Sequence, residues 1–105
     1  MNSLKLELKT TIRGNDMAVK NPKPMHPGKV LAEVYMSELG LNQTQLAERL
    51  GCAHRKVNEI INGKRGISSD FALDLERFLG TSAEMWVTMQ AAWDLWAARQ
   101  KRRAA

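Results

Sequence analysis

Between residues 27 and 98, apolar side chains recur three and four positions apart, which is the spacing of one face of an α-helix. Glycines and short polar residues interrupt this pattern, as they do where helices end and begin. The pattern predicts five helices. The first runs from Pro27 to Leu39, the second is capped by Asn42 and ends before Gly51, and the third runs from Ala53 to Ile61. The fourth opens at Ser68 or Ser69 and stops at Gly80, and the fifth, which is longer, begins at a capping box of Thr81 and Glu84. Five helices with short connections and no central strand predict an all-α domain.

The stretch from Leu41 to Gly66 combines two short apolar stripes with a tight turn. In the first stripe, Ala47 is small enough for two helices to cross closely, and Gly51 tolerates the positive φ that such a turn needs. Val57 and Ile60 then occupy the apolar positions of a second short helix. Because these constrained positions agree over about twenty residues, the stretch predicts a helix-turn-helix.

The first 23 residues differ in pattern from the rest of the chain. Leu4, Leu6 and Leu8 alternate with charged residues, which indicates a short strand or an arm ready to pair as one. The run Asn21-Pro22-Lys23-Pro24 is incompatible with a helix. We therefore expect a flexible or strand-forming arm over residues 1–23, although Met17 is an alternative start of translation.

Charge is distributed unevenly, and its distribution is more informative than the total of +5. Residues 42–66 have a net charge of +3, residues 99–105 have +4, and residues 67–98 have −4. One end of the molecule therefore suits phosphate and the other suits a basic partner. The alternative is that the acidic residues simply form solvated helix faces. We divide the chain into the arm, a helix-turn-helix domain over residues 24–98 and a basic tail over residues 99–105.

Composition and motifs exclude several classes of protein. A chain of 105 residues has the size of one small domain, its single cysteine cannot form an intrachain disulfide, and no apolar run is long enough to span a membrane. We therefore expect a cytoplasmic protein. His26, Cys52 and His54 lack the spacing and acidic neighbours of a metal site, and the sequence has neither a catalytic triad framework nor a glycine-rich phosphate loop. The sequence thus predicts no enzyme and no metal or cofactor.

With the helices assigned, residues 24–96 resemble the phage-repressor-like (XRE) helix-turn-helix family and, within it, the HigA-type antitoxins. Three stretches carry the closer resemblance: Met25-His26-Pro27-Gly28, Asn62-Gly63-Lys64-Arg65-Gly66-Ile67-Ser68, and Gly80-Thr81-Ser82 through Met85-Trp86 to Met89-Gln90-Ala91-Ala92-Trp93-Asp94-Leu95. The resemblance implies a type II antitoxin that neutralises a RelE-like, mRNA-cutting toxin of the HigB type. It also implies a homodimer that binds operator DNA, an inverted repeat, and represses its own operon. The alternative is a stand-alone transcriptional regulator with no toxin partner.

The candidate DNA-binding residues lie at the start of the first motif helix, along the second, and just beyond it: Gln43, Thr44, His54, Arg55, Lys56, Asn58, Glu59, Asn62, Lys64 and Arg65. The resemblance places Gln43 and Asn62 near backbone phosphates. The first turns of the second helix carry the side chains that contact base edges in this motif. There, Arg55 suits guanine and Asn58 suits adenine. The two basic residues just beyond the helix suit phosphate.

Two positions depart from the family pattern. Ala53 replaces the Ser or Thr that is usual before the second motif helix, and the missing hydroxyl cap costs about 1 kcal/mol. Glu59 places an acid on the helix that approaches DNA, where it either accepts a hydrogen bond from cytosine N4 or repels phosphate. Both departures predict weaker DNA binding than is usual in the family.

The last predicted helix carries Trp86, Met89, Trp93 and Trp96 at spacings of three and four residues. Trp86 is expected in the core. The other three are expected in a symmetric dimer contact, because so small a domain has little core left for them. The alternative is that all four pack within one chain.

Two sets of residues are candidates for the toxin contact: Leu4, Leu6 and Leu8, which suit strand addition, or the acidic Asp70, Asp74 and Glu76.

Overall fold

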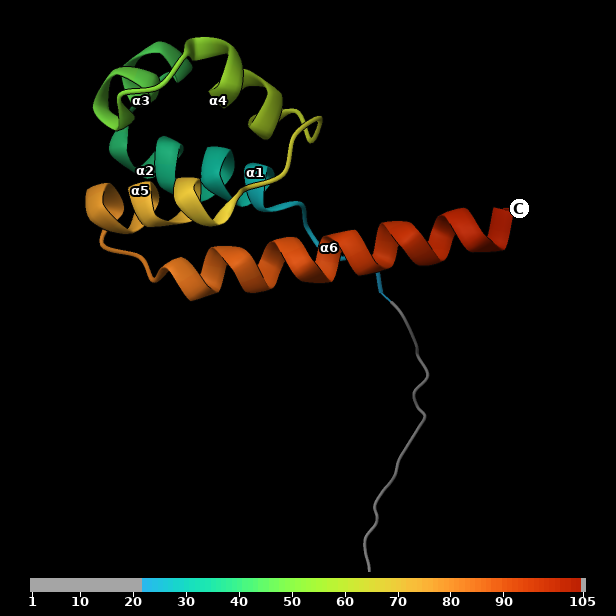
Figure 1. Cartoon of the computed structure of the whole chain (residues 1–105). Helices are drawn as coiled ribbons and strands as arrows, with labels where there is room; N and C mark the ends of the chain where they lie inside the picture. The colour runs from blue at the N-terminus through green and yellow to red at the C-terminus, as the bar shows by residue number, and fades with distance from the viewer. Residues whose placement is uncertain (1–21, 105) are drawn as a thin grey trace, which may run out of the picture.

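The computed structural model describes residues 22–104 and shows, over that range, helices joined by short turns and no strand. The helical segments are α1 (Pro27–Val30), η1 (Leu31–Met36), α2 (Ser37–Leu39), α3 (Gln43–Leu50), α4 (His54–Ile61), α5 (Ser69–Leu79) and α6 (Ala83–Ala104) (Figure 1). The first three form one continuous helix, because Leu31 and Ser37 at their junctions stay right-handed helical while the hydrogen bonding of η1 widens to the π pattern. The predicted all-α domain of five helices is confirmed.

Side chains at the helix starts explain where two of the helices begin. At α3, Asn42 Oδ1 accepts a hydrogen bond from the Gln45 amide at 2.8 Å, and Gln45 Oε1 accepts one from the Asn42 amide at 2.9 Å. This is the predicted capping box. At α5, Ser68 Oγ accepts a hydrogen bond from the Phe71 amide at 3.1 Å. Ala53 gives α4 no side-chain cap, as expected from its methyl group.

The predicted cap of α6 is wrong. Ser82, and not Thr81, supplies it, because Ser82 Oγ accepts a hydrogen bond from the Met85 amide at 3.0 Å. The Thr81 hydroxyl instead accepts a hydrogen bond from the indole N–H of Trp86 at 2.7 Å. Glu84, three residues after Thr81, made Thr81 the better candidate in the sequence. The buried indole requires an acceptor, however, and Thr81 is the residue that supplies it.

The core lies between the first helix, the α3–α4 pair and α5, and the start of α6 closes it. Its large, fully buried side chains come from all five helices: Leu31, Leu46, Val57, Ile60, Phe71, Leu75 and Trp86. Burial of each such side chain contributes roughly 1.5–3 kcal/mol. Trp86 is therefore a core residue, as predicted, and its ring centroid lies 5.5 Å from that of Tyr35. Cys52 packs at the edge of this core, where burial raises the pKa of its thiol.

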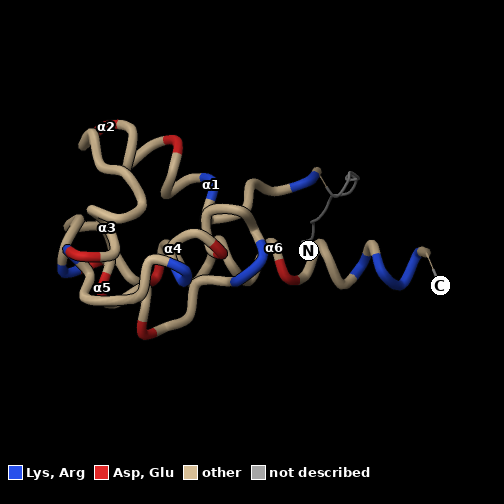
Figure 2. The backbone as a smooth tube through the Cα atoms, turned by 90° about the horizontal axis from the view of Figure 1, so that it is seen from above, with Lys and Arg blue, Asp and Glu red and all other residues tan. Residues whose placement is uncertain are grey.

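α6 is longer than the core that it covers. Its first half packs against α5 and α1, and its second half extends past the other helices (Figure 1). The basic residues at 99–103, predicted to form a tail, lie on the last turns of this helix (Figure 2). Positive charge at a helix C-terminus is favourable because it complements the helix dipole. The boundaries proposed at residues 23 and 98 stay predictions, and Leu4, Leu6, Leu8 and Met17 lie outside the described residues.

The three stretches that resemble HigA-type antitoxins meet around His26. His26 Nδ1 caps the first helix by accepting a hydrogen bond from the Gly28 amide at 2.9 Å. The imidazole meets the Trp93 ring edge-on, with centroids 5.1 Å apart. Beside them, Gln90 Oε1 accepts a hydrogen bond from the buried Ile67 amide at 2.8 Å. These contacts connect the start of the first helix, the loop after α4 and the middle of α6.

Candidate nucleic-acid interface

α3 and α4 form a helix-turn-helix, and contacts at the middle and near the end of α4 hold it in place. The turn begins at Gly51, whose φ of 70° is the predicted positive value. Asn58 Nδ2 donates a hydrogen bond to Gln43 Oε1 at 2.9 Å, which ties the middle of α4 to the first turn of α3. Near the end of α4, the Ile60 carbonyl lies against Gly28, and a Cβ at Gly28 would overlap it. α4 therefore has a fixed orientation relative to the rest of the domain.

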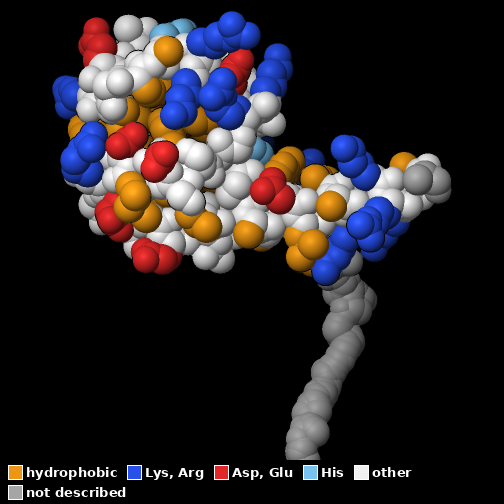
Figure 3. All heavy atoms as spheres, viewed as in Figure 1, with side chains coloured by type: hydrophobic (Ala, Val, Ile, Leu, Met, Phe, Trp, Pro, Cys, Tyr) orange, Lys and Arg blue, Asp and Glu red, His pale blue; other side chains and the backbone are white. Residues whose placement is uncertain are grey.

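The outward face of α4 is polar. Val57 and Ile60 are fully buried, so the opposite side of the helix faces solvent. Predicted DNA-binding residues on α4 and the following loop are exposed or half-buried: His54, Arg55, Asn58, Glu59, Asn62, Lys64 and Arg65. Gln43 and Thr44 lie at the adjoining start of α3. Figure 3 shows Lys and Arg side chains gathered over this end of the molecule, and acidic side chains over α5 and the start of α6.

Lys56 is the exception among the predicted DNA-binding residues. Its side chain is half-buried, and its Nζ lies 5.1 Å from the centroid of the Phe71 ring. A cation held over an aromatic face is favourable, and this contact turns the lysine toward α5. The structure therefore places Lys56 at the flank of α4 and does not bring it to the outward face.

Glu59 lies between two arginines on the outward face. Its Oε2 accepts a hydrogen bond from Arg55 Nε at 3.1 Å, and its Oε1 accepts one from Arg65 Nε at 2.9 Å and forms an ion pair with Arg65 Nη2 at 2.8 Å. The hydrogen bond from Arg65, and then the one from Arg55, hold the pKa of the Glu59 carboxyl below its usual value. The spacing of Arg55 and Glu59 was a sequence signal for one of these contacts. Nothing local in the sequence indicated Arg65.

Comparison with known proteins decides the family. The sequence matches the Helix-turn-helix family over residues 31–86, more than half of the chain. The chain belongs to the helix-turn-helix family. This helix-turn-helix protein is 41% identical over 88 residues to Virulence-associated protein I of Dichelobacter nodosus, with 83% of this chain and 82% of the relative covered.

Two solved structures place this helix-turn-helix protein near the HigA-type antitoxins. The Pseudomonas aeruginosa antitoxin HigA with the higBA promoter is 35% identical, with a TM-score of 0.70 over 75% of this chain and 89% of the other. Antitoxin GraA in complex with its operator is 37% identical, with a TM-score of 0.73 over 82% of this chain and 87% of the other. The resemblance drawn from the three sequence stretches is thus confirmed.

In this helix-turn-helix protein, the three α6 residues predicted at a dimer contact have different surroundings. Met89 packs against the core of its own chain. Trp93 and Trp96 are half-buried, with ring centroids 5.2 Å apart, and Lys23 Nζ lies 5.8 and 5.3 Å from their centroids. Leu95, between them in sequence, is 53% exposed. An apolar surface therefore remains on the half of α6 that extends beyond the core.

The acidic residues predicted to bind the toxin also differ from one another. Asp74 forms an ion pair with Arg77 at 3.4 Å. Glu76 Oε2 accepts a hydrogen bond from the Ala83 amide at 2.9 Å and so helps to start α6. Asp70 is exposed on the first turn of α5. Of the three acids, Asp70 is therefore the best placed to meet a partner.

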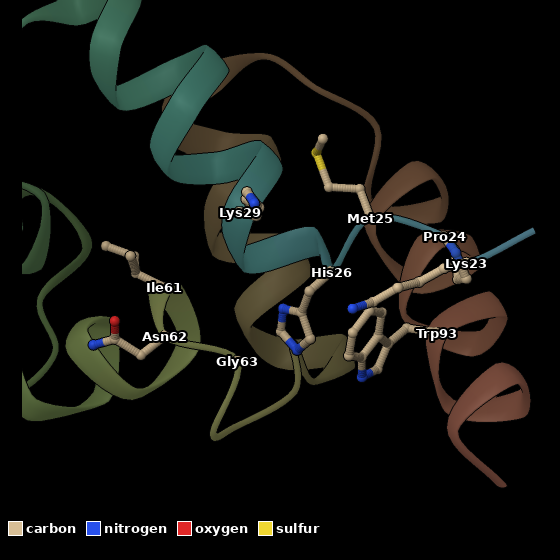
Figure 4. A pocket seen from close by; sticks show the side chains of 9 residues that line it. All are labelled: Lys23, Pro24, Met25, His26, Lys29, Ile61, Asn62, Gly63 and Trp93. Atoms are coloured by element: carbon tan, nitrogen blue, oxygen red, sulfur yellow. The ribbon is translucent and has the colours of Figure 1, made fainter. Parts of the chain in front are cut away.

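A pocket of about 490 Å³ opens between the start of the first helix, the end of α4 and α6 (Figure 4). Its lining comes from all three places: Lys23, Pro24, Met25, His26, Lys29, Ile61, Asn62, Gly63 and Trp93. Sequence reasoning missed this pocket, although all three of the stretches that resemble HigA-type antitoxins contribute to it. Lys29 and Asn62 line the same pocket, so a basic residue shares this opening with a predicted phosphate contact.

Residues 22–104 contain no group of three or more His, Cys, Asp or Glu side chains that could hold a metal ion. No helix in that range is long and apolar enough to cross a membrane.

Proposed function

We propose that this chain is the antitoxin of a type II toxin–antitoxin pair and that its homodimer binds operator DNA to repress its own operon. The observation that carries the proposal is the outward face of α4, which presents Arg55, Asn58 and Asn62 on a helix of fixed orientation. The major groove of B-DNA is wide enough to admit an α-helix. The related antitoxin structures with a promoter and with an operator support this use of the motif.

Individual side chains on this surface carry hydrogen-bonding groups that match those of bases and phosphates in DNA. Arg55 suits the O6 and N7 acceptors of guanine. The bond from Asn58 to Gln43 uses one of its two N–H groups, so its other N–H and its Oδ1 remain for an adenine edge. Lys64 and Lys29, on the loop after α4 and on α1, suit phosphates on either side of the groove. We expect the base contacts to decide the sequence and the lysines to add affinity.

A second copy of the chain is the partner that we propose for the exposed apolar surface of α6. Trp96 and Leu95 lie on the half of α6 that extends past the core, where a two-fold axis allows two helices to bury the same residues in each other. Such a dimer would present two copies of α4 to successive major grooves, about 34–36 Å apart. The operator is then an inverted repeat with half-sites one helical turn apart.

For the toxin we propose the α5–α6 surface. Leu73 and Val87 are 54% and 41% exposed and line a groove of about 270 Å³ together with Ala83 and Glu84. Asp70 stands on the adjoining first turn of α5. An apolar groove with carboxylates at its edge suits a basic protein that inserts an apolar side chain, such as a RelE-like toxin.

The alternative, a stand-alone regulator, is favoured by one observation. Asp74 and Glu76, two of the three acids proposed for the toxin, already bind groups of their own chain. Co-purification with a RelE-like protein encoded beside this gene distinguishes the two functions. We expect a stable complex that is lost in Leu73→Asp and kept in Val34→Asp, a matched change at a residue that is 49% exposed on the first helix. A chain that binds no such neighbour would be a regulator alone.

DNA binding is tested with the purified full chain and the DNA of its own promoter. We expect clear preference for the promoter over random DNA at moderate salt. Non-specific attraction to phosphate weakens steeply as the salt concentration rises, whereas base contacts persist. The affinities for promoter DNA and random DNA should therefore be compared at moderate salt, not at low salt. Equal affinity for the two DNAs would refute the repressor function.

A further inference from the structure

Glu59 and its two arginine partners, Arg55 and Arg65, form what we call the Glu59 cluster. The Glu59 side chain is 23% exposed, against 86% for Arg55 and 49% for Arg65. The backbone takes part as well, because the amides of Lys64 and Arg65 donate hydrogen bonds to the Glu59 carbonyl at 2.8 and 3.2 Å. One residue therefore holds both the arginine on the first turn of α4 and the loop that follows the helix.

Neither stability nor affinity accounts for a carboxylate at this position. Ion pairs between exposed side chains contribute little to folding, since solvent screens them and the side chains lose freedom. An acid on the DNA-facing helix also lowers the general attraction for phosphate. What the Glu59 cluster does supply is a preferred orientation for two long side chains that otherwise rotate freely.

The atoms used in the cluster determine which donors remain. Arg55 binds Glu59 through Nε, so both of its terminal nitrogens stay available for a bidentate contact with guanine O6 and N7. Arg65 uses Nε and Nη2, which leaves the Nη1 end of its guanidinium for another acceptor. The two arginines are thus presented differently, because Glu59 binds Arg55 through Nε alone and Arg65 through Nε and Nη2.

We propose that Glu59 is a positioning residue that gives the protein its sequence discrimination, by presenting Arg55 end-on to one guanine of the half-site. The inference rests on the DNA-binding function proposed above and deepens it. Glu59 itself contacts no base. Its effect is to orient the specific contact, while its negative charge weakens the attraction to the phosphates of every sequence alike.

The experiment begins with a site selected by the full-length wild-type protein from a random-sequence DNA library. Affinities for that site and for a shuffled version are then measured for wild type, Glu59→Gln and Glu59→Asp. Asp keeps the charge but retracts the carboxylate by one methylene, so it separates orientation from charge. Glu38→Gln is the matched control, because it makes the same charge change at an exposed residue of α2. Thermal unfolding confirms that each variant is folded.

We expect both Glu59 variants to lower the ratio of specific to shuffled affinity by about tenfold, as the loss of one oriented guanine contact requires. Glu59→Gln should also tighten binding to the shuffled DNA, whereas Glu59→Asp should not. Glu38→Gln should leave the ratio unchanged. In an Arg55→Ala background, Glu59→Gln should have no further effect on the ratio, because the group that it positions is absent.

Opposite results identify which proposal fails. If wild type selects a site but both Glu59 variants keep the wild-type ratio, Glu59 has no positioning role and only this inference is overturned. The same conclusion follows if Glu59→Gln lowers the ratio equally with and without Arg55. If wild type selects no site at all, the DNA-binding function fails, and this inference fails with it.

Discussion

At the scale of single residues, His26 makes a hydrogen bond that depends on the protonation state of its side chain. Its Nδ1 must lack a proton in order to accept the hydrogen bond from the Gly28 amide. Burial lowers the pKa of the imidazole below its ordinary 6.5, and the nearby Asp94 carboxylate partly opposes this shift. The neutral form is therefore the one that the fold selects.

A dependence of stability on pH follows. Because the unfolded chain takes up the proton first, the contribution of neutral His26 is complete above pH 6.5 and is lost as pH falls through the lower pKa of the folded state. His26→Asn keeps an oxygen acceptor for the cap but does not titrate. Urea unfolding at pH 7.5 and 5.5 should show a larger loss of stability in wild type than in His26→Asn. Equal losses would mean that His26 does not couple protonation to folding.

At the scale of secondary-structure elements, α4 is the helix with a local defect. Its N-cap residue, Ala53, has the extended φ of −70° and ψ of 141° that a capping residue adopts, but it has no side-chain hydrogen bond. α3 and α5 are capped by Asn42 and Ser68. Packing of Val57 and Ile60 must therefore keep α4 in place, which explains why a weak helix is still well formed.

Ala53→Ser should repair this defect. The hydroxyl would accept a hydrogen bond from the first turn of α4 and stabilise the domain by about 1 kcal/mol. Chemical unfolding measures the gain. Ala53→Gly, which adds no such acceptor, is the control and should gain less than Ala53→Ser. Equal stabilities for the Ser and Gly variants would show that the start of α4 cannot accept a cap.

At the scale of the whole molecule, α6 both completes the core and carries an apolar surface beyond it. Its first half completes the core through Trp86, and its second half carries Trp96 and Leu95 beyond that core. Trp93 contacts both parts of the molecule, because it packs against His26 of its own chain and against Trp96. The two tryptophans should therefore respond differently to substitution.

Trp96→Ala should shift the protein toward the monomer and weaken binding to an inverted repeat, while the thermal stability of the monomer changes little. Trp93→Ala should in addition destabilise the monomer, since it removes the ring that packs on His26. Sedimentation and thermal unfolding together separate these effects. A wild type that sediments as a monomer at tens of micromolar, where a dimer of modest affinity would form, would refute the dimer.

The sequence by itself determined the helices, the turn and the capping box of α3, and it narrowed the start of α5 to Ser68 or Ser69. These features depend on contacts within three or four residues: the Asn42–Gln45 capping box, the Ser68 cap and the positive φ of Gly51. Because the helical period shows which side of α4 is apolar, the outward face with Arg55 was predictable too. Local hydrogen bonds and helical periodicity depend only on residues that are close in sequence, so the sequence alone is enough to predict them.

Tertiary structure decided the roles of several polar side chains. Lys56 turned to Phe71 and Thr81 to Trp86, because a buried or aromatic neighbour competed with the predicted partner. Glu59, which as an isolated acid would repel phosphate, is held by Arg55 and by Arg65 from the loop after the helix. Side-chain interactions depend on distance in space, and the fold brings together groups that sequence spacing leaves unrelated. The outward face of α4, which we propose approaches DNA, was therefore predictable from sequence, but the partners of its side chains became visible only in the folded chain.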